Sequence, residues 1–179
     1  TIFGGKFSYR CKESFFIETR EPIAFLVMRD RFDHFLMKRA QEEGAEALEG
    51  EKVTRIEERG NGVEAELANG ERFRSQYLIG ADGAESVVAR SISLAPQRND
   101  GNGIAVQSEI FFDSSIYLPR KELHFVHLDF GRIPNGYGWV FPKRESLSIG
   151  VGGMFRETKK MNPRRYLDAF LKDLGYIPE

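Results

Sequence analysis

The sequence has few of the features that mark disulfide-linked, metal-rich or membrane-spanning proteins. Cys11 is its only cysteine, which excludes an intramolecular disulfide and a multi-cysteine metal site. The three histidines do not form a metal-binding set: they are His34, His124 and His127. No apolar run approaches the length needed to span a bilayer, and a net charge of -1 shows no sign of nucleic-acid binding. We therefore expect a globular protein of a reducing, cytoplasmic compartment, with no metal and no nucleic-acid partner.

Tryptophan is as scarce as cysteine, whereas phenylalanine is abundant. The chain of 179 residues holds one Trp and 15 Phe, with 41% hydrophobic and 30% charged residues. This length gives room for one large domain or two small ones, each with a proper core. The many phenylalanines indicate either an aromatic-lined cavity or aromatic packing in a β-rich core.

Residues 77–90, YLIGADGAESVVAR, form the most informative stretch. The pattern predicts a strand that ends in a turn of small residues and opens a helix, which presents unpaired backbone N–H groups to a ligand. Asp82 stands at the carboxyl end of that strand, where open α/β sheets bind ligands. An acceptor beside N–H donors suits a ligand with hydroxyls and phosphates, such as a dinucleotide. The alternative is an ordinary strand–turn–helix with a capping Asp.

This stretch resembles the second FAD fingerprint, Gly-Ala-Asp-Gly-Ala-x-Ser-x-Val-x-Arg, of the flavoprotein monooxygenase and geranylgeranyl reductase superfamily. Residues 80–90 match every fixed position of that pattern. The resemblance implies that Asp82 holds a ribitol or ribose hydroxyl of FAD. It also implies that the turn at Gly83 lies beside the pyrophosphate.

Residues 31–43 are predicted to form a helix. Asp30 suits the N-cap, and Gly44 the position just after the helix. Four apolar residues follow the spacing of one stripe, which we expect to be buried: Phe32, Phe35, Leu36 and Ala40. Strands are expected over residues 51–58, 63–67 and 71–74, joined by turns at Gly60-Asn61-Gly62 and Asn69-Gly70.

Residues 29–90 as a whole resemble the second half of the FAD domain in the same superfamily. The pattern Arg-x-x-Phe-Asp-x-x-Leu-x-x-x-Ala-x-x-x-Gly-Ala is matched at every position, by Arg29, Phe32, Asp33, Leu36, Ala40, Gly44 and Ala45. The resemblance implies that Arg29 lies near the phosphates or ribityl chain of the flavin, and that the backbone at Val53 pairs with adenine. An ion pair between Arg29 and Asp33 on the helix surface is the simpler alternative.

The remaining segments are rich in strands. Residues 1–28 are β-rich, residues 91–103 resemble a linker, and residues 103–154 contain four strand candidates that indicate an antiparallel sheet. Asn162-Pro163 begins a last helix, whose apolar stripe consists of Tyr166, Leu167, Phe170, Leu171 and Leu174.

A second informative stretch, YGWVFPK, lies in this sheet. Tyr137, Trp139 and Phe141 alternate, so their rings are expected on one sheet face, suited to a long apolar or planar ligand or to ordinary core packing. Gly138, on the opposite face, permits close approach of another element. The stretch is similar to the Tyr-x-Trp-x-Phe-Pro-Lys motif of the geranylgeranyl reductase branch. That similarity implies that Tyr137 and Trp139, and by position Phe141, line a cavity for an isoprenoid chain.

Two motifs of the superfamily do not occur in the chain: the Gly-x-Gly-x-x-Gly loop and the later Gly-Asp-Ala-Ala motif. We therefore expect the middle part of a longer enzyme, which alone binds FAD poorly or not at all. The expected fold combines part of a glutathione-reductase-like Rossmann domain with an antiparallel substrate sheet, in the α/β and α+β classes. The expected divisions are an entry segment of the substrate domain (residues 1–28), the centre of the FAD domain (29–90) and the substrate-binding sheet with its helix (91–179).

The function expected from this resemblance is the reduction of polyprenyl C=C bonds by hydride transfer from reduced FAD. Either a nicotinamide, NAD(P)H, or a ferredoxin-like protein is the electron donor. A flavin monooxygenase or halogenase acting on an aromatic substrate is the alternative on the same scaffold. A non-catalytic lipid-binding module is a third. Association with a membrane through the substrate, and a homodimer formed by edge pairing, are further expectations.

Overall fold

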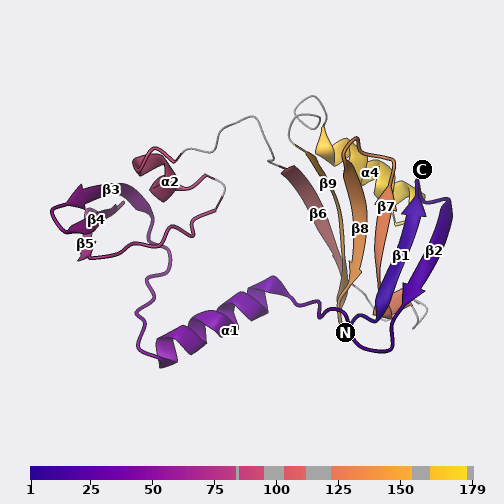
Figure 1. The fold of residues 1–179 in the computed structure, drawn as a ribbon, viewed down its shortest axis with the longest axis horizontal. Helices are drawn as coiled ribbons and strands as arrows, with labels where there is room; N and C mark the ends of the chain where they lie inside the picture. The colour runs from indigo at the N-terminus through magenta and orange to yellow at the C-terminus, as the bar shows by residue number, and fades with distance from the viewer. Residues whose placement is uncertain (84, 95–102, 112–121, 155–161, 177–179) are drawn as a thin grey trace. The chain divides into compact units, whose positions relative to one another are not determined.

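The computed structural model describes residues 1–83, 85–94, 103–111, 122–154 and 162–176 (Figure 1). The chain divides into two compact units. The first consists of residues 1–33 and 98–179, and the second of residues 34–97. No helix among the described residues is both long enough and apolar enough to cross a membrane.

The first unit is built on a six-stranded sheet with the order β2-β1-β7-β8-β9-β6. Its strands are β1 (Gly4–Tyr9), β2 (Glu13–Glu18), β6 (Gly103–Phe111), β7 (Phe125–Phe130), β8 (Gly136–Pro142) and β9 (Ser146–Met154). A short 3-10 turn, η1 (Glu122–His124), precedes β7, so the strand begins later than the predicted residue 121. All neighbours are antiparallel except β1 and β7, which run parallel. The alternation of apolar residues did not reveal this pairing, because it joins strands far apart in the chain.

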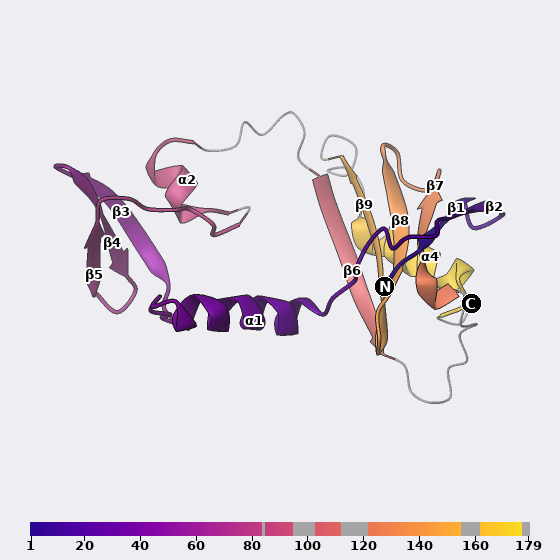
Figure 2. The same cartoon turned by 60° about the horizontal axis from the view of Figure 1, so that its bottom comes forward.

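One face of this sheet is covered by helix α4 (Pro163–Asp173) (Figure 1, Figure 2). The predicted cap is confirmed, because the Asn162 side chain accepts a hydrogen bond from the backbone N–H of Arg164 at 3.0 Å. The predicted stripe is also confirmed in its centre: Leu167, Phe170 and Leu171 are buried. They pack with Val140, Leu147, Ile149 and Val151 of the sheet.

Gly138 permits this close packing, as expected from its position between two aromatic residues. A Cβ atom at Gly138 would lie only 2.9 Å from the ring of Phe170. The helix therefore approaches the sheet where β8 has no side chain.

The second unit contains the small antiparallel sheet β3-β4-β5. Its strands are β3 (Val53–Arg59), β4 (Gly62–Leu67) and β5 (Arg72–Ser75), followed by the short helix α2 (Val87–Ser91). Both predicted hairpin turns are present, and the glycines in them, Gly60 and Gly70, have positive φ values of 62° and 89°. These turns place the strands in the predicted order because glycine adopts such backbone angles without strain.

The strand predicted at residue 77 is wrong. Residues 77–79 form no strand, and Tyr77 and Ile79 are 86% and 90% exposed. A parallel strand of this apolar type takes its backbone hydrogen bonds from neighbours on both sides. The described strands of the second unit offer no such neighbour, since β3, β4 and β5 pair only with one another.

The expected burial of the first long helix is also wrong. Helix α1 spans Arg29–Glu42, so Asp30 lies in its first turn rather than at the N-cap. No residue of α1 is buried within the described part of the chain, and Phe32, Phe35 and Leu36 are 42%, 56% and 49% exposed. Helical spacing predicts a stripe correctly, but a stripe is buried only where another element covers it.

Candidate functional site

Asp82 binds the beginning of helix α2 in this structure. Its Oδ2 atom accepts hydrogen bonds from the backbone N–H groups of Val87, at 2.6 Å, and Val88, at 3.3 Å. The Ser86 hydroxyl donates to Oδ1. The hydrogen bond from Ser86 and those from the two N–H groups lower the pKa of Asp82, although partial desolvation opposes them. The carboxylate is therefore ionised at neutral pH and fixed in direction.

The same turn keeps room for a ligand. The Asp82 side chain is exposed, so its carboxylate is accessible to a ligand hydroxyl that donates a hydrogen bond. Gly83 has a φ of 80°, and among the described residues, its chain neighbours aside, no atom lies within 4 Å of the point where its Cβ would be. The residues present thus fit a cofactor that brings a hydroxyl to Asp82 and a phosphate close to the backbone of Gly83.

Arg29 forms the ion pair with Asp33 that their spacing of four residues on a helix allows. Its Nε and Nη2 atoms donate to the two carboxylate oxygens of Asp33, at 3.0 and 2.9 Å. The Arg29 side chain remains 77% exposed, so its other N–H groups face solvent. The structure thus shows the surface pair and leaves donors for a phosphate.

Val53 begins the edge strand of the small sheet. It pairs with Leu67 of β4, and the ladder is irregular between Val53 and Arg55. Because β3 lies at the edge of β3-β4-β5, its outer backbone groups have no strand beside them among the described residues. An edge strand can pair with a planar ligand in the same way as with another strand.

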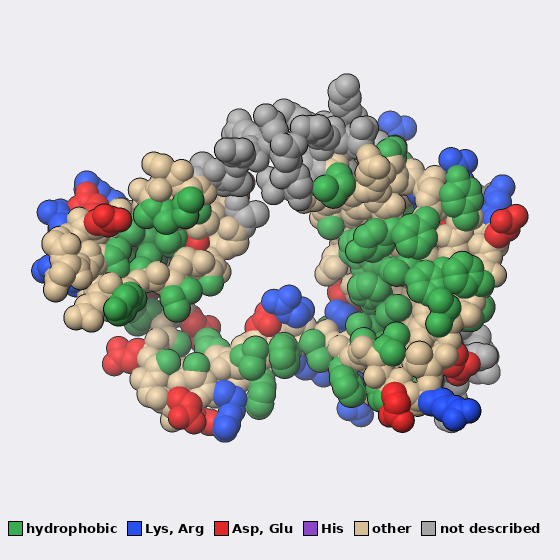
Figure 3. Space-filling view, in the orientation of Figure 1, with side chains coloured by type: hydrophobic (Ala, Val, Ile, Leu, Met, Phe, Trp, Pro, Cys, Tyr) green, Lys and Arg blue, Asp and Glu red, His purple; other side chains and the backbone are tan. Residues whose placement is uncertain are grey.

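The face of the large sheet opposite α4 is lined by aromatic side chains. Strand alternation puts Tyr137, Trp139 and Phe141 on this face, with successive ring centroids 6.0 and 6.1 Å apart. Phe130 of β7 continues the row, 6.1 Å from Tyr137. Figure 3 shows hydrophobic side chains gathered over these strands. We call these four residues the aromatic row.

Two glycines of β9 lie beneath the indole of Trp139. A Cβ at Gly150 would overlap the ring, and one at Gly152 would lie 3.5 Å from it. Trp139 is therefore only 9% exposed and lies flat on the sheet, while Tyr137 is 43% exposed. The row thus has a fixed centre and an accessible end.

A cluster of polar side chains lies at the other end of this face, beyond Phe141. Lys143 donates to Glu109 at 2.7 Å, and the Ser146 hydroxyl donates to the same carboxylate at 2.9 Å. Burial alone would raise the pKa of Glu109, but hydrogen bonds from Lys143, Ser146 and Ser148 outweigh it and lower that pKa. Sequence reasoning missed this cluster. Its one signal in the sequence is the alternation of the strands. Glu109 of β6 pairs with Ser148 of β9, and Ser146 lies two residues before Ser148, on the same face.

A second polar network, also missed, lies on the α4 side of the sheet. Asp129 is fully buried and accepts hydrogen bonds from the Ser8 hydroxyl at 2.6 Å, the Cys11 N–H at 2.6 Å and Arg132 Nε at 3.1 Å. Burial raises the pKa of the Cys11 thiol, and Asp129 raises it further. The thiol therefore remains protonated at neutral pH, which argues against a reactive thiolate.

Comparison with known proteins shows the family of this chain. Residues 7–170 match the family described as FAD binding domain. An uncharacterised protein of Methanosarcina barkeri is 33% identical over 163 residues, covering 91% of this chain and 40% of the relative. Digeranylgeranylglycerophospholipid reductase 1 of Methanopyrus kandleri is 37% identical over 138 residues, covering 74% of this chain and 36% of the relative.

Solved structures share the fold. Halogenase PltM in complex with phloroglucinol and FAD superposes with a TM-score of 0.67 at 19% identity, over 98% of this chain and 40% of that one. A flavoprotein/dehydrogenase from Cytophaga hutchinsonii gives a TM-score of 0.65 at 20% identity, over 98% and 45%. The chain belongs to the FAD-binding domain family, and FAD is the cofactor of that family. It spans about two fifths of the length of the curated relatives it matches.

Proposed function

We propose that this chain is part of an FAD-dependent oxidoreductase that saturates C=C bonds in the isoprenoid chains of a lipid. The observation that supports it best is the aromatic row. It offers a long apolar surface above the glycines of β9, opposite the face that α4 covers. Relatives named digeranylgeranylglycerophospholipid reductase support the same substrate class.

In this proposal the second unit holds the cofactor. Asp82 would accept a hydrogen bond from a hydroxyl of FAD, and the open backbone at Gly83 would accommodate a phosphate. Arg29 belongs to the first unit; two N–H groups of its guanidinium are engaged by Asp33, and the rest would be offered to a phosphate. Val53 offers the outer backbone edge of β3 to the adenine.

The aromatic row orients the substrate. A branched polyprenyl chain would lie along this row, whose rings are about 6 Å apart, because the exposed Tyr137 and Phe130 present apolar surface to it.

Reduced FAD, when bound, supplies the hydride for one carbon of the double bond. A proton from solvent completes the second C–H bond, so each saturated bond consumes one hydride and one proton. A nicotinamide or a ferredoxin-like protein then supplies the electrons for the next cycle. Because the substrate is a membrane lipid, the enzyme associates with the membrane surface through it.

Truncation of Tyr137 tests this assignment in the intact, FAD-loaded protein. Flavin reoxidation by a geranylgeranyl lipid would be followed without oxygen, for the native protein, Tyr137→Ala and the control Phe73→Ala in the second unit. Loss of one ring contact should raise KM for the lipid roughly tenfold in Tyr137→Ala. Phe73→Ala should leave KM unchanged. An equal KM in all three proteins would remove the aromatic row from substrate binding.

The same assay separates the alternatives. A flavin monooxygenase or halogenase would show oxygen consumption triggered by an aromatic substrate and no oxygen-free reoxidation by the lipid. A lipid-binding module would bind the lipid without any change in flavin.

A further inference from the structure

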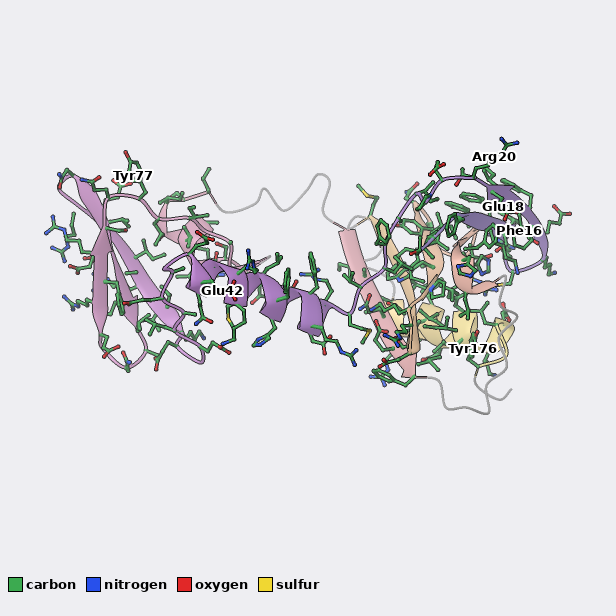
Figure 4. The ribbon with its side chains drawn as sticks, turned by 90° about the horizontal axis from the view of Figure 1, so that it is seen from below. Phe16, Glu18, Arg20, Glu42, Tyr77 and Tyr176 are labelled. Atoms are coloured by element: carbon green, nitrogen blue, oxygen red, sulfur yellow. The ribbon has the colours of Figure 1, made fainter. Side chains whose placement is uncertain are left out.

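A cavity of about 300 Å³ lies behind the sheet, beside helix α4. Its lining includes the apolar residues Phe125, Val140 and Leu147 and the basic residues Lys6 and Lys12. Aromatic residues from two segments complete the lining: Phe16 of β2 and Tyr176, which follows α4 (Figure 4). This volume is at the lower end of small-molecule sites.

The cavity is separate from the aromatic row. Val140 and Pro142 line it and alternate along β8 with Trp139 and Phe141, which point to the other face. In β1, Lys6 and Ser8 line the cavity, whereas Phe7 points away from it. A ligand in this cavity would touch none of the residues assigned above to FAD or substrate.

The charges around the cavity favour an anion. Its described lining contains two lysines and one aspartate, Asp173. Asp173 already forms an ion pair with Arg132. The ammonium group of Lys6 lies 5.8 Å from the centroid of the Phe16 ring, which also lines the cavity.

The hydrogen-bond directions exclude a hydrolytic site here. Ser8 donates its only hydroxyl hydrogen to Asp129, and its oxygen lies 2.7 Å from Nε2 of His127. His127 must therefore donate from Nε2, so it cannot take a proton from Ser8 as a general base would. Ser8, His127 and Asp129 thus hold one another in position, and Ser8 and His127 form a polar side of the cavity.

We propose that this cavity binds an amphiphilic anion, a phosphate or carboxylate on a short alkyl chain. The anionic group is bound by Lys6 and Lys12 of the lining, through charge-assisted hydrogen bonds. The alkyl chain lies on Phe125, Val140 and Leu147. The site is independent of the proposed reaction, because it lies on the opposite face of the sheet.

Calorimetric titration of the intact, FAD-loaded protein with hexyl phosphate tests this site. Hexyl phosphate should bind saturably, and inorganic phosphate and hexanol should each bind at least roughly tenfold more weakly, since each lacks half of the interactions. The double variant Lys6→Gln/Lys12→Gln should lose roughly tenfold or more in affinity. Lys38→Gln on α1, which removes one exposed positive charge outside the lining, is the matched control and should bind normally.

A second readout locates the ligand. The imidazole NMR signal of His127 should shift during the titration, while that of His34 stays in place. No saturable binding, affinity unchanged in the double lysine variant, or equal binding of inorganic phosphate would each overturn the proposal. So would binding that leaves the His127 signal unmoved.

Discussion

Asp82 has two roles in this account, as an acceptor for the first N–H groups of α2 and as an acceptor for FAD, and a pair of substitutions distinguishes them. Asp82→Ala removes the carboxylate and its hydrogen bonds to the helix, whereas Ser86→Ala removes the N-cap side chain and keeps the carboxylate. We expect Asp82→Ala to weaken FAD binding by the intact protein roughly tenfold more than Ser86→Ala does. Fluorescence titration measures both. Equal losses would mean that Asp82 acts only through the helix.

Asp129 is a buried charge whose removal should be costly. Asp129→Ala leaves the Cys11 N–H and the Ser8 hydroxyl without their acceptor, and Arg132 loses its buried partner. We expect the free energy of unfolding to fall by about 3–5 kcal/mol, measured by urea denaturation. Asp173→Asn removes the exposed partner of the same Arg132 and should cost less than about 1 kcal/mol. Equal costs would contradict the burial argument.

His127 should make stability depend on pH. Burial, and then the nearby charge of Lys6, lower the pKa of His127 from 6.5 to about 4, although Asp129 opposes them. Between pH 4 and pH 6.5 the unfolded chain therefore binds a proton more readily at His127 than the folded chain does. The contribution of neutral His127 to the free energy of unfolding is fully present above pH 6.5 and is lost as the pH falls toward 4. With allowance for solvent screening, the loss should be about 1–3 kcal/mol.

The variant His127→Gln provides the control for this prediction. Denaturation curves between pH 7 and 4 should show a shallower slope in the variant than in the native protein. Identical slopes would mean that His127 titrates normally in the folded state.

At the scale of elements, the contact between β8 and β9 decides the shape of the aromatic row. Gly150→Ala places a methyl group where the Trp139 indole lies. We expect it to cost about 1–3 kcal/mol and to displace the ring. Because Trp139 is the only tryptophan, the emission spectrum reports the displacement directly.

A double-variant cycle controls that prediction. In the background Trp139→Leu, the smaller side chain should relieve the overlap, so Gly150→Ala should cost markedly less. An unchanged cost would show that the methyl group meets another obstacle.

Elements defined by local chemistry were predicted from the sequence, and elements defined by distant partners were not. The turns at Gly60 and Gly70 and the cap at Asn162 form as predicted, because backbone angles and side-chain caps depend on a few adjacent residues. The Asp-Gly turn and the alternation of Tyr137 and Trp139 are likewise local.

Predictions that depended on distant contacts were less successful. The segment at Tyr77 forms no strand and the stripe of α1 is exposed, because both patterns require a covering or pairing partner. The parallel pairing of β1 with β7 and the burial of Asp129 were missed for the same reason. Neither leaves a periodic signal in the sequence.

At the scale of the whole molecule, the proposal assigns one part of a flavoenzyme to each unit. The second unit contains the Asp-Gly turn and the β3 edge that suit FAD, and the first contains the aromatic row that suits an apolar chain. The family match extends over residues 7–170 and so includes both units. This combination is what the proposed reductase requires.

One measurement tests the central claim most directly. The flavin of the intact protein would be reduced and mixed, without oxygen, with a digeranylgeranyl glycerophospholipid, while absorbance and product mass are recorded. The account predicts that the oxidised flavin spectrum returns and that the lipid gains one H₂ for each flavin reoxidised. A flavin that stays reduced in the presence of bound lipid, and reoxidises only with oxygen, would contradict it.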